Sequence, residues 1–184
     1  MTQKSTVREL CISALFTAII CVMAQISIPI QPVPFTFSVL AIFLTGAILP
    51  PRMALMSTLA YIALGAVGVP VFAGFKGGLN ALVGMTGGYI AAFPIMAIVI
   101  SLACTKFKQS KVIAPAVSMA ISLAICYGLG TAWFCYVAKS SFVTGLSLCV
   151  IPYIPFDILK LILATGFAYS IKKVFARYKT RLAD

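Results

Sequence analysis

The chain is poor in acid and has no histidine. Only three of its 184 residues are Asp or Glu. Glu9 and Asp184 lie near the ends of the sequence, which leaves Asp157 as the interior carboxylate. A serine or cysteine nucleophile needs a neighbouring base, usually a histidine or a carboxylate. Because the sequence offers so few bases, we expect no enzymatic activity.

Metal-ligand clusters and phosphate-binding loops are also missing from the sequence. The six cysteines are scattered without a C-x-x-C pair, whereas structural zinc sites need clustered Cys or His ligands. The phosphate-loop pattern G-x-x-x-x-G-K-[ST] does not occur. The sequence therefore predicts no metal site, no cofactor and no nucleotide binding. Most of the cysteines lie in apolar runs, where small free thiols usually serve in packing.

What the chain has in excess is apolar surface. Its hydrophobic fraction is 62% and its charged fraction is 9%, whereas soluble domains are about 45–50% apolar and about 25% charged. A soluble protein of this length cannot bury so much apolar surface. We therefore predict a multi-pass protein of the cell membrane, in contact with membrane lipid, whose residues 1–184 form a single domain.

The apolar runs predict an all-α membrane protein built as a six-transmembrane-helix bundle. A spanning helix needs about 20 mostly apolar residues, and prolines, glycines and short polar stretches separate the runs of this chain. The predicted spans are residues 10–28, 35–49, 53–69, 86–104, 112–137 and 150–174.

The net charge of +11 is interpreted as membrane topology, with no nucleic-acid partner. Most basic residues lie at the N-terminus, in the loop that contains Arg52, in the loop 105–111 and in the C-terminal tail. The opposite loops carry Lys76 and Lys139. Cytoplasmic loops carry the excess of Lys and Arg. We therefore expect both termini to be cytoplasmic.

Asp157 and Lys160 lie in the middle of apolar sequence. A charge at the centre of a membrane helix costs about 2.5–3.5 kcal/mol on insertion scales. The two residues are three apart, so they share one helix face, and Ala164 and Ala168 continue this face towards the bundle interior. They could form a self-sufficient ion pair, but such a pair seldom regains its desolvation cost. We favour a role in holding a polar ligand.

A second candidate is the glycine-rich segment 71–89, which contains Asn80. It could be a simple connection, but glycine permits the close backbone approach that a binding loop needs. On the predicted topology it shares the outer side with the proline-rich loop 29–34. We expect the two loops to cover a pocket that opens outwards.

The helix predicted at 112–137 carries two rows of small residues, which allow close helix packing in lipid. We expect both rows to pack mainly within the chain. They are Ala120, Ala124, Gly128 and Ala132, and Ser118, Ser122, Cys126 and Gly130. In the first predicted helix, Ala14 and Ala18 form a shorter row, for which internal packing and partner docking are equally favoured by the pattern alone.

Five short motifs together resemble BioY, the family of biotin-specific S components of energy-coupling factor (ECF) transporters. The motifs cover nearly the whole chain in order: AQISIPI at 24–30, VPFT at 33–36, GVPVFAG at 68–74, TGGY at 86–89 and FDxxK at 156–160. The chain departs from the family at Phe37-Ser38, where Leu-Gln is usual, and at Met85, where proline is usual.

The resemblance implies a function and a set of partners. It implies a six-helix substrate-binding domain that captures biotin with high affinity from outside the cell. It also implies a transmembrane coupling subunit, which docks on the small face formed by Ala14 and Ala18, and two ATPase subunits. The alternatives are a binding component for another small vitamin and a membrane assembly protein that transports nothing.

The resemblance also implies which residues bind biotin. Asn80, Asp157 and Lys160 match the family's binding positions, and Thr36 and Tyr89 lie in the shared motifs. Asp157 is expected to accept from a ureido N–H while Lys160 donates to the ureido oxygen. Alternatively, Lys160 pairs with the biotin carboxylate. On the first assignment, the carboxylate lies near the outer loops, at Lys76 or at the backbone N–H groups of Gly77 and Gly78.

Overall fold

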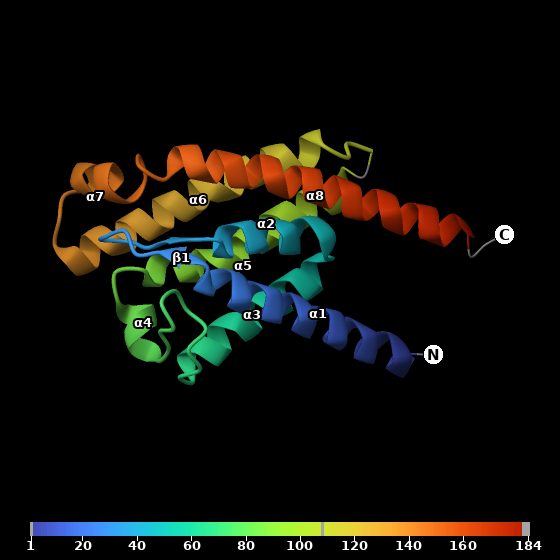
Figure 1. Cartoon of the computed structure of the whole chain (residues 1–184), viewed down its shortest axis with the longest axis horizontal. Helices are drawn as coiled ribbons and strands as arrows, with labels where there is room; N and C mark the ends of the chain where they lie inside the picture. The colour runs from blue at the N-terminus through green and yellow to red at the C-terminus, as the bar shows by residue number, and fades with distance from the viewer. Residues whose placement is uncertain (1, 108, 182–184) are drawn as a thin grey trace.

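The computed structural model describes residues 2–107 and 109–181, and it describes no side chains in 2–5 or 175–181. The basic residue Lys108, counted above in the loop 105–111, lies outside these ranges. The described chain consists of helices and one small hairpin (Figure 1). The longer helices are α1 (Thr2–Gln25), α2 (Ser38–Ile48), α3 (Pro51–Ala66), α5 (Gly87–Lys106), α6 (Ile113–Ala138) and α8 (Ile154–Arg181). The shorter elements are β1 (Ser27–Ile28), β2 (Phe35–Thr36), α4 (Leu79–Val83) and α7 (Phe142–Cys149).

Four of the described helices are long and apolar enough to cross a membrane. These stretches are Thr6–Gln25, Gly87–Lys106, Ile113–Ala138 and Ile154–Val174. They match four of the predicted spans, so the chain is a helical, multi-pass membrane protein. The other two predicted spans correspond to α2 and α3, which are helical but have only 11 and 16 residues. Two prolines separate these helices: Pro50 follows the end of α2, and Pro51 is the first residue of α3. Proline suits the first turn of a helix because a backbone N–H at that position would have no partner within the helix.

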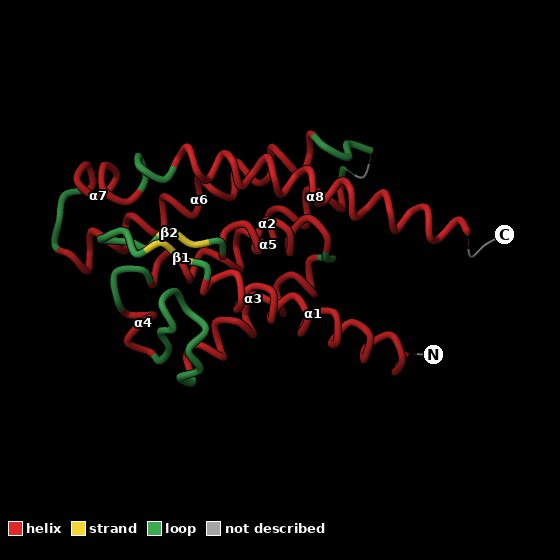
Figure 2. Tube along the Cα trace, viewed as in Figure 1, coloured by secondary structure: helices red, strands yellow, loops and turns green. Residues whose placement is uncertain are grey.

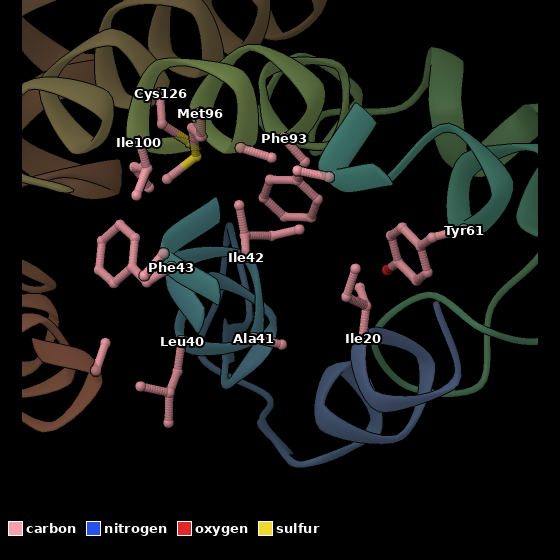
Figure 3. Packing of buried hydrophobic residues seen from close by; sticks show 14 of the residues in the cluster. Ile20, Leu40, Ala41, Ile42, Phe43, Tyr61, Phe93, Met96, Ile100 and Cys126 are labelled. Carbon is pink, nitrogen blue, oxygen red and sulfur yellow. The ribbon is translucent and has the colours of Figure 1, made fainter. Parts of the chain in front are cut away.

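α2 forms the centre of the bundle. At about 1.5 Å per residue, its 11 residues span roughly half of a hydrocarbon core that is about 30 Å thick. It packs against α1, α3, α5 and α8, and Figure 3 shows Ile42 and Phe43 among side chains from the surrounding helices. Both residues are fully buried. The helix therefore forms core for its neighbours instead of facing lipid.

The loops differ from the predicted ones in three places. The first helix ends at Gln25, not at residue 28, because Ser27 and Ile28 pair with Thr36 and Phe35 in an antiparallel hairpin. α4 interrupts the glycine-rich segment, and α7 lies in the connection between the last two predicted spans. The last helix, α8, begins at Ile154, four residues after its predicted start. Hydrogen-bonded local structure satisfies backbone groups that an irregular loop would leave unpaired.

The elements around the candidate site gather at one end of the bundle. The hairpin, α4 and α7 lie together, and the first turn of α1 and the last turn of α8 project from the opposite end (Figures 1 and 2). The two predicted outer loops are thus on the same end of the molecule.

The two small-residue rows of α6 have different surroundings. Ser118, Ser122, Cys126 and Gly130 are buried, and α6 packs closely against α5, as expected for helix–helix packing through small residues. The row Ala120, Ala124, Gly128 and Ala132 is exposed. The prediction that this alanine-rich row packs within the chain is wrong, because α6 turns its opposite face to the bundle.

Candidate functional site

Asp157 and Lys160 form an ion pair inside the bundle. The Lys160 Nζ lies 2.7 Å from the Asp157 Oδ1, and each residue is 4% exposed. Asp157 lies in the first turn of α8, where the helix dipole favours a negative charge. Ala164 and Ala168 continue the same face and are also buried. The predicted inward orientation of this face is confirmed.

Two aromatic side chains contact the ion pair. The Tyr127 hydroxyl, from α6, donates to the Asp157 Oδ2 at 2.5 Å, so Tyr127 and Lys160 use different carboxylate oxygens. The Lys160 Nζ lies 3.8 Å from the centre of the Phe35 ring, a distance at which the ring face attracts a cation. Phe35 is brought here by the hairpin, in which it pairs with Ile28.

The pair retains hydrogen-bonding capacity for a further molecule. An ammonium group has three N–H donors and a carboxylate has about four acceptor sites. Among the described residues, the Lys160 ammonium donates to Asp157, and the carboxylate accepts from Lys160 and Tyr127. Free donors and acceptors therefore stand side by side, which suits a ligand group that both donates and accepts.

Two adjoining cavities lie at this end of the bundle. The smaller, of about 70 Å³, is lined by Asp157 and Lys160. The larger, of about 460 Å³, lies beneath the glycine-rich segment, and its volume is within the range of small-molecule sites, about 300–1,000 Å³. The two cavities share the wall residues Val33, Pro34, Thr36, Ser38, Tyr89 and Phe93.

The structure brings most of the predicted site residues to these cavities. Asn80 and Gly77 line the larger one, and Thr36 and Tyr89 line both. The Tyr89 hydroxyl is also within 3.2 Å of the Thr131 hydroxyl, with which it shares a hydrogen bond. The larger cavity is thus bordered by the hairpin, the glycine-rich segment and α5.

Gly78 is the exception. It does not line either cavity, and its N–H donates to the Gly65 carbonyl at 2.7 Å, so this donor already has a partner. Its φ of +87° is a backbone conformation that favours glycine. Lys76 lines the larger cavity and its side chain is exposed, so the structure brings this cation to the cavity where the carboxylate was predicted to lie.

Sequence analysis missed several residues that shape the site. Tyr127 follows Cys126 of the buried α6 row, and this row is the signal by which it could have been found. Phe35 was noted only as part of a family motif. Its contact with Lys160 was missed because the hairpin that places it there was not predicted. Tyr153, which precedes α8, donates its hydroxyl to the Val33 carbonyl. Burial raises the pKa of the Tyr153 hydroxyl, so it stays protonated and able to donate.

Gly65 supports the cavity wall from α3. A Cβ at this position would lie 1.9 Å from the Phe72 Cζ, and Phe72 lines the larger cavity and contacts the Tyr61 ring edge-on. Gly65→Ala should therefore displace Phe72 and lower the melting temperature, because overpacking costs about 1–3 kcal/mol. Gly128→Ala is the control, since no atom lies within 4 Å of its added Cβ. A Gly65→Ala protein that melts at or above the wild-type temperature would contradict the packing described.

The chain is similar in sequence to a known protein family and to individual relatives. The sequence matches the model of the BioY family over residues 1–177. It is 40% identical over 167 residues to the biotin transporter BioY of Thermotoga maritima, a match that covers 91% of this chain and 97% of the relative. It is 38% identical over 155 residues to the probable biotin transporter BioY of Pyrococcus horikoshii, covering 83% and 89%.

The fold is also similar to a solved structure. A crystal structure of the S-component for biotin from an ECF-type ABC transporter superposes with a TM-score of 0.86 and 28% sequence identity. The match covers 94% of this chain and 95% of that chain. The similarity of fold therefore extends over nearly the whole length of both chains.

Proposed function

Since the chain belongs to the BioY family, we propose that it is the biotin-binding S component of an ECF-type transporter. It captures biotin from outside the cell with high affinity, and residues 1–184 act as one substrate-binding domain. The observation that carries this proposal is the buried Asp157–Lys160 pair at the end of a largely apolar cavity. The relatives favour biotin over another vitamin or a non-transporting assembly protein.

The chemistry of biotin suits the site from both ends. Its ureido group has two N–H donors and one carbonyl acceptor, its bicycle and valeryl chain are apolar, and it ends in a carboxylate. We place the ureido group at Asp157, which accepts from an N–H, and at Lys160, which donates to the oxygen. The apolar part then occupies the larger cavity, and the carboxylate lies near Lys76, Gly77 and Asn80, which line it.

Two lysine variants test this orientation. Lys160→Ala should weaken the binding of both biotin and a carboxyl-blocked biotin amide by about tenfold or more, since a hydrogen bond from a charged group contributes about 1.5–3 kcal/mol. Lys76→Met should weaken the binding of biotin by a few fold and leave the binding of the amide unchanged. Both effects are measured by equilibrium binding to purified protein. If Lys160→Ala matters only when the carboxylate is free, the ligand lies in the opposite orientation.

We further propose that the bundle crosses the membrane six times with both termini in the cytoplasm. The distribution of basic residues supports this topology, and the start of α1 and the end of α8 lie at the same end of the bundle (Figure 1). The second and third crossings are then made by α2 and α3 together with the residues that flank them, because the 11 residues of α2 span only about half of the hydrocarbon core. A reporter fused after Asp184 should be found inside the cell, and an external reporter would refute the topology.

Uphill uptake requires energy from other subunits. The sequence has no phosphate loop of its own, so we propose a complex with a transmembrane coupling subunit and two ATPase subunits. Ala14 and Ala18 are exposed on α1, and small residues four apart permit close helix approach in lipid. This face is therefore our proposed docking site for the coupling subunit.

A further inference from the structure

Gln25 connects the end of α1 to the glycine-rich segment. Its Oε1 accepts from the Phe75 N–H at 3.0 Å. Its Nε2 donates to the Phe72 carbonyl at 3.2 Å and to the Pro70 carbonyl at 3.3 Å, and the Cys21 carbonyl lies at 3.5 Å. One amide side chain thus binds both donor and acceptor groups of a segment that is 45 to 50 residues away in the sequence.

The contacts fix the orientation of this amide. An amide group offers two N–H donors and a carbonyl oxygen, and here the donors meet carbonyls while the oxygen meets an N–H. A rotation by 180° would place the Gln25 oxygen against the carbonyls of Phe72 and Pro70. The arrangement therefore needs both halves of the amide, and no apolar side chain of the same length can replace it.

The segment that Gln25 holds is a tight turn. Phe72 and Lys76 pair as an isolated antiparallel bridge, with N···O distances of 2.9 and 3.2 Å. Phe75, at the tip, has a φ of +56° and an exposed ring. A residue with a side chain persists in this conformation only where its surroundings hold it. The bond from the Phe75 N–H to Gln25 is such a constraint.

The same turn forms part of the cavity wall. Phe72, Ala73, Lys76 and Gly77 line the larger cavity, and so does Ala24, the neighbour of Gln25 on α1. Phe72 is buried against Tyr61, which anchors one side of the turn. Gln25 anchors the other side of the turn through hydrogen bonds to its backbone. Gln25 therefore positions this part of the cavity wall whatever side chains the turn carries.

We propose that Gln25 is the clasp that holds residues 70–76 over the binding cavity and thereby retains the bound ligand. It is a positioning residue, because it acts through the turn. This inference rests on the proposed function, since it requires that the cavity hold biotin. Because α1 also carries Ala14 and Ala18, the clasp ties the cover of the cavity to the helix with the proposed docking face.

The test uses the isosteric variant Gln25→Met and the control Gln109→Met, which changes an exposed glutamine in the loop between α5 and α6. Hydrogen exchange of ligand-free protein and biotin dissociation are measured for both. Gln25→Met should speed exchange at the backbone amides of residues 71–76 without changing exchange in α5 and α6. The variant should also speed biotin dissociation about tenfold, with a smaller change in the association rate. The reason is that each hydrogen bond lost between residue 25 and the turn contributes only modestly to the free energy that holds the turn in place.

The outcomes separate the clasp from the proposed function. Unchanged exchange at the amides of residues 71–76, or faster exchange there with unchanged biotin dissociation, would overturn the clasp. If wild type and Gln109→Met fail to bind biotin, the proposed function fails instead. Gln25→Glu provides a second variant, which keeps the acceptor for Phe75 but loses the donors to Pro70 and Phe72. It should also speed dissociation, and a wild-type rate in a folded Gln25→Glu protein would equally overturn the clasp.

Discussion

Replacing Asp157 with asparagine should raise the dissociation constant for biotin by about 100-fold or more. The asparagine still offers an oxygen to Tyr127, but it loses the charge-assisted bond to the ligand, worth about 1.5–3 kcal/mol. It also leaves the Lys160 ammonium, 4% exposed, without its counter-ion, so the cation no longer has a fixed position. Each 1.4 kcal/mol corresponds to a factor of ten, and the two losses act together. Titration of the purified protein with biotin measures the effect.

Lys173→Met is the matched control for this charge change. Lys173 lies on the same helix, α8, and is exposed, so its removal should leave the binding of biotin at the wild-type level. An Asp157→Asn protein that is folded and binds biotin as tightly as the control would show that the carboxylate only stabilises the bundle.

Replacing Ala18 with leucine should abolish biotin uptake by cells while leaving biotin binding intact. Ala18 is exposed on α1, away from both cavities, so the added side chain does not enter the site. Where two helices meet through small residues, a leucine prevents close approach of the backbones. Co-purification with the coupling subunit should therefore fall at least about tenfold.

Ala124→Leu is the matched control for this docking prediction. Ala124 belongs to the exposed small-residue row of α6, so it tests the same substitution on another exposed surface of small residues. It should assemble and transport like the wild type. If Ala124→Leu blocks assembly and Ala18→Leu does not, the coupling subunit docks on α6, and the assignment to α1 is wrong.

The ion pair was predictable because its signal is local. A carboxylate and a lysine three apart in apolar sequence must share one helix face, and a bilayer leaves them only the bundle interior. The partners of the pair were not predictable in this way. Tyr127 reaches Asp157 from a helix 30 residues away, and Phe35 reaches Lys160 only because a two-residue strand turns it inwards. Such contacts depend on helix packing, which one sequence does not reveal.

The loops show the same difference between features that local sequence predicts and contacts that only the folded chain reveals. The glycine content of segment 71–89 correctly indicated close backbone approach, and Gly77 illustrates it, since an added Cβ would lie 2.5 Å from the Val69 carbonyl oxygen. The sequence did not indicate that the Gly78 N–H would bond to Gly65. Gln25 stood within a recognised motif, but its contacts with a turn about 50 residues away became visible only in the folded chain.

The central claim is that Asp157 and Lys160 hold a ligand in addition to each other. The most direct test is a calorimetric titration of biotin into wild type and into the double variant Asp157→Asn/Lys160→Met, with melting temperatures measured in parallel. Removing both charges leaves neither one unpaired, so the double variant should melt near or above the wild-type temperature. We predict tight binding by the wild type and no measurable binding by the folded double variant. Equal binding by the two proteins would contradict the account.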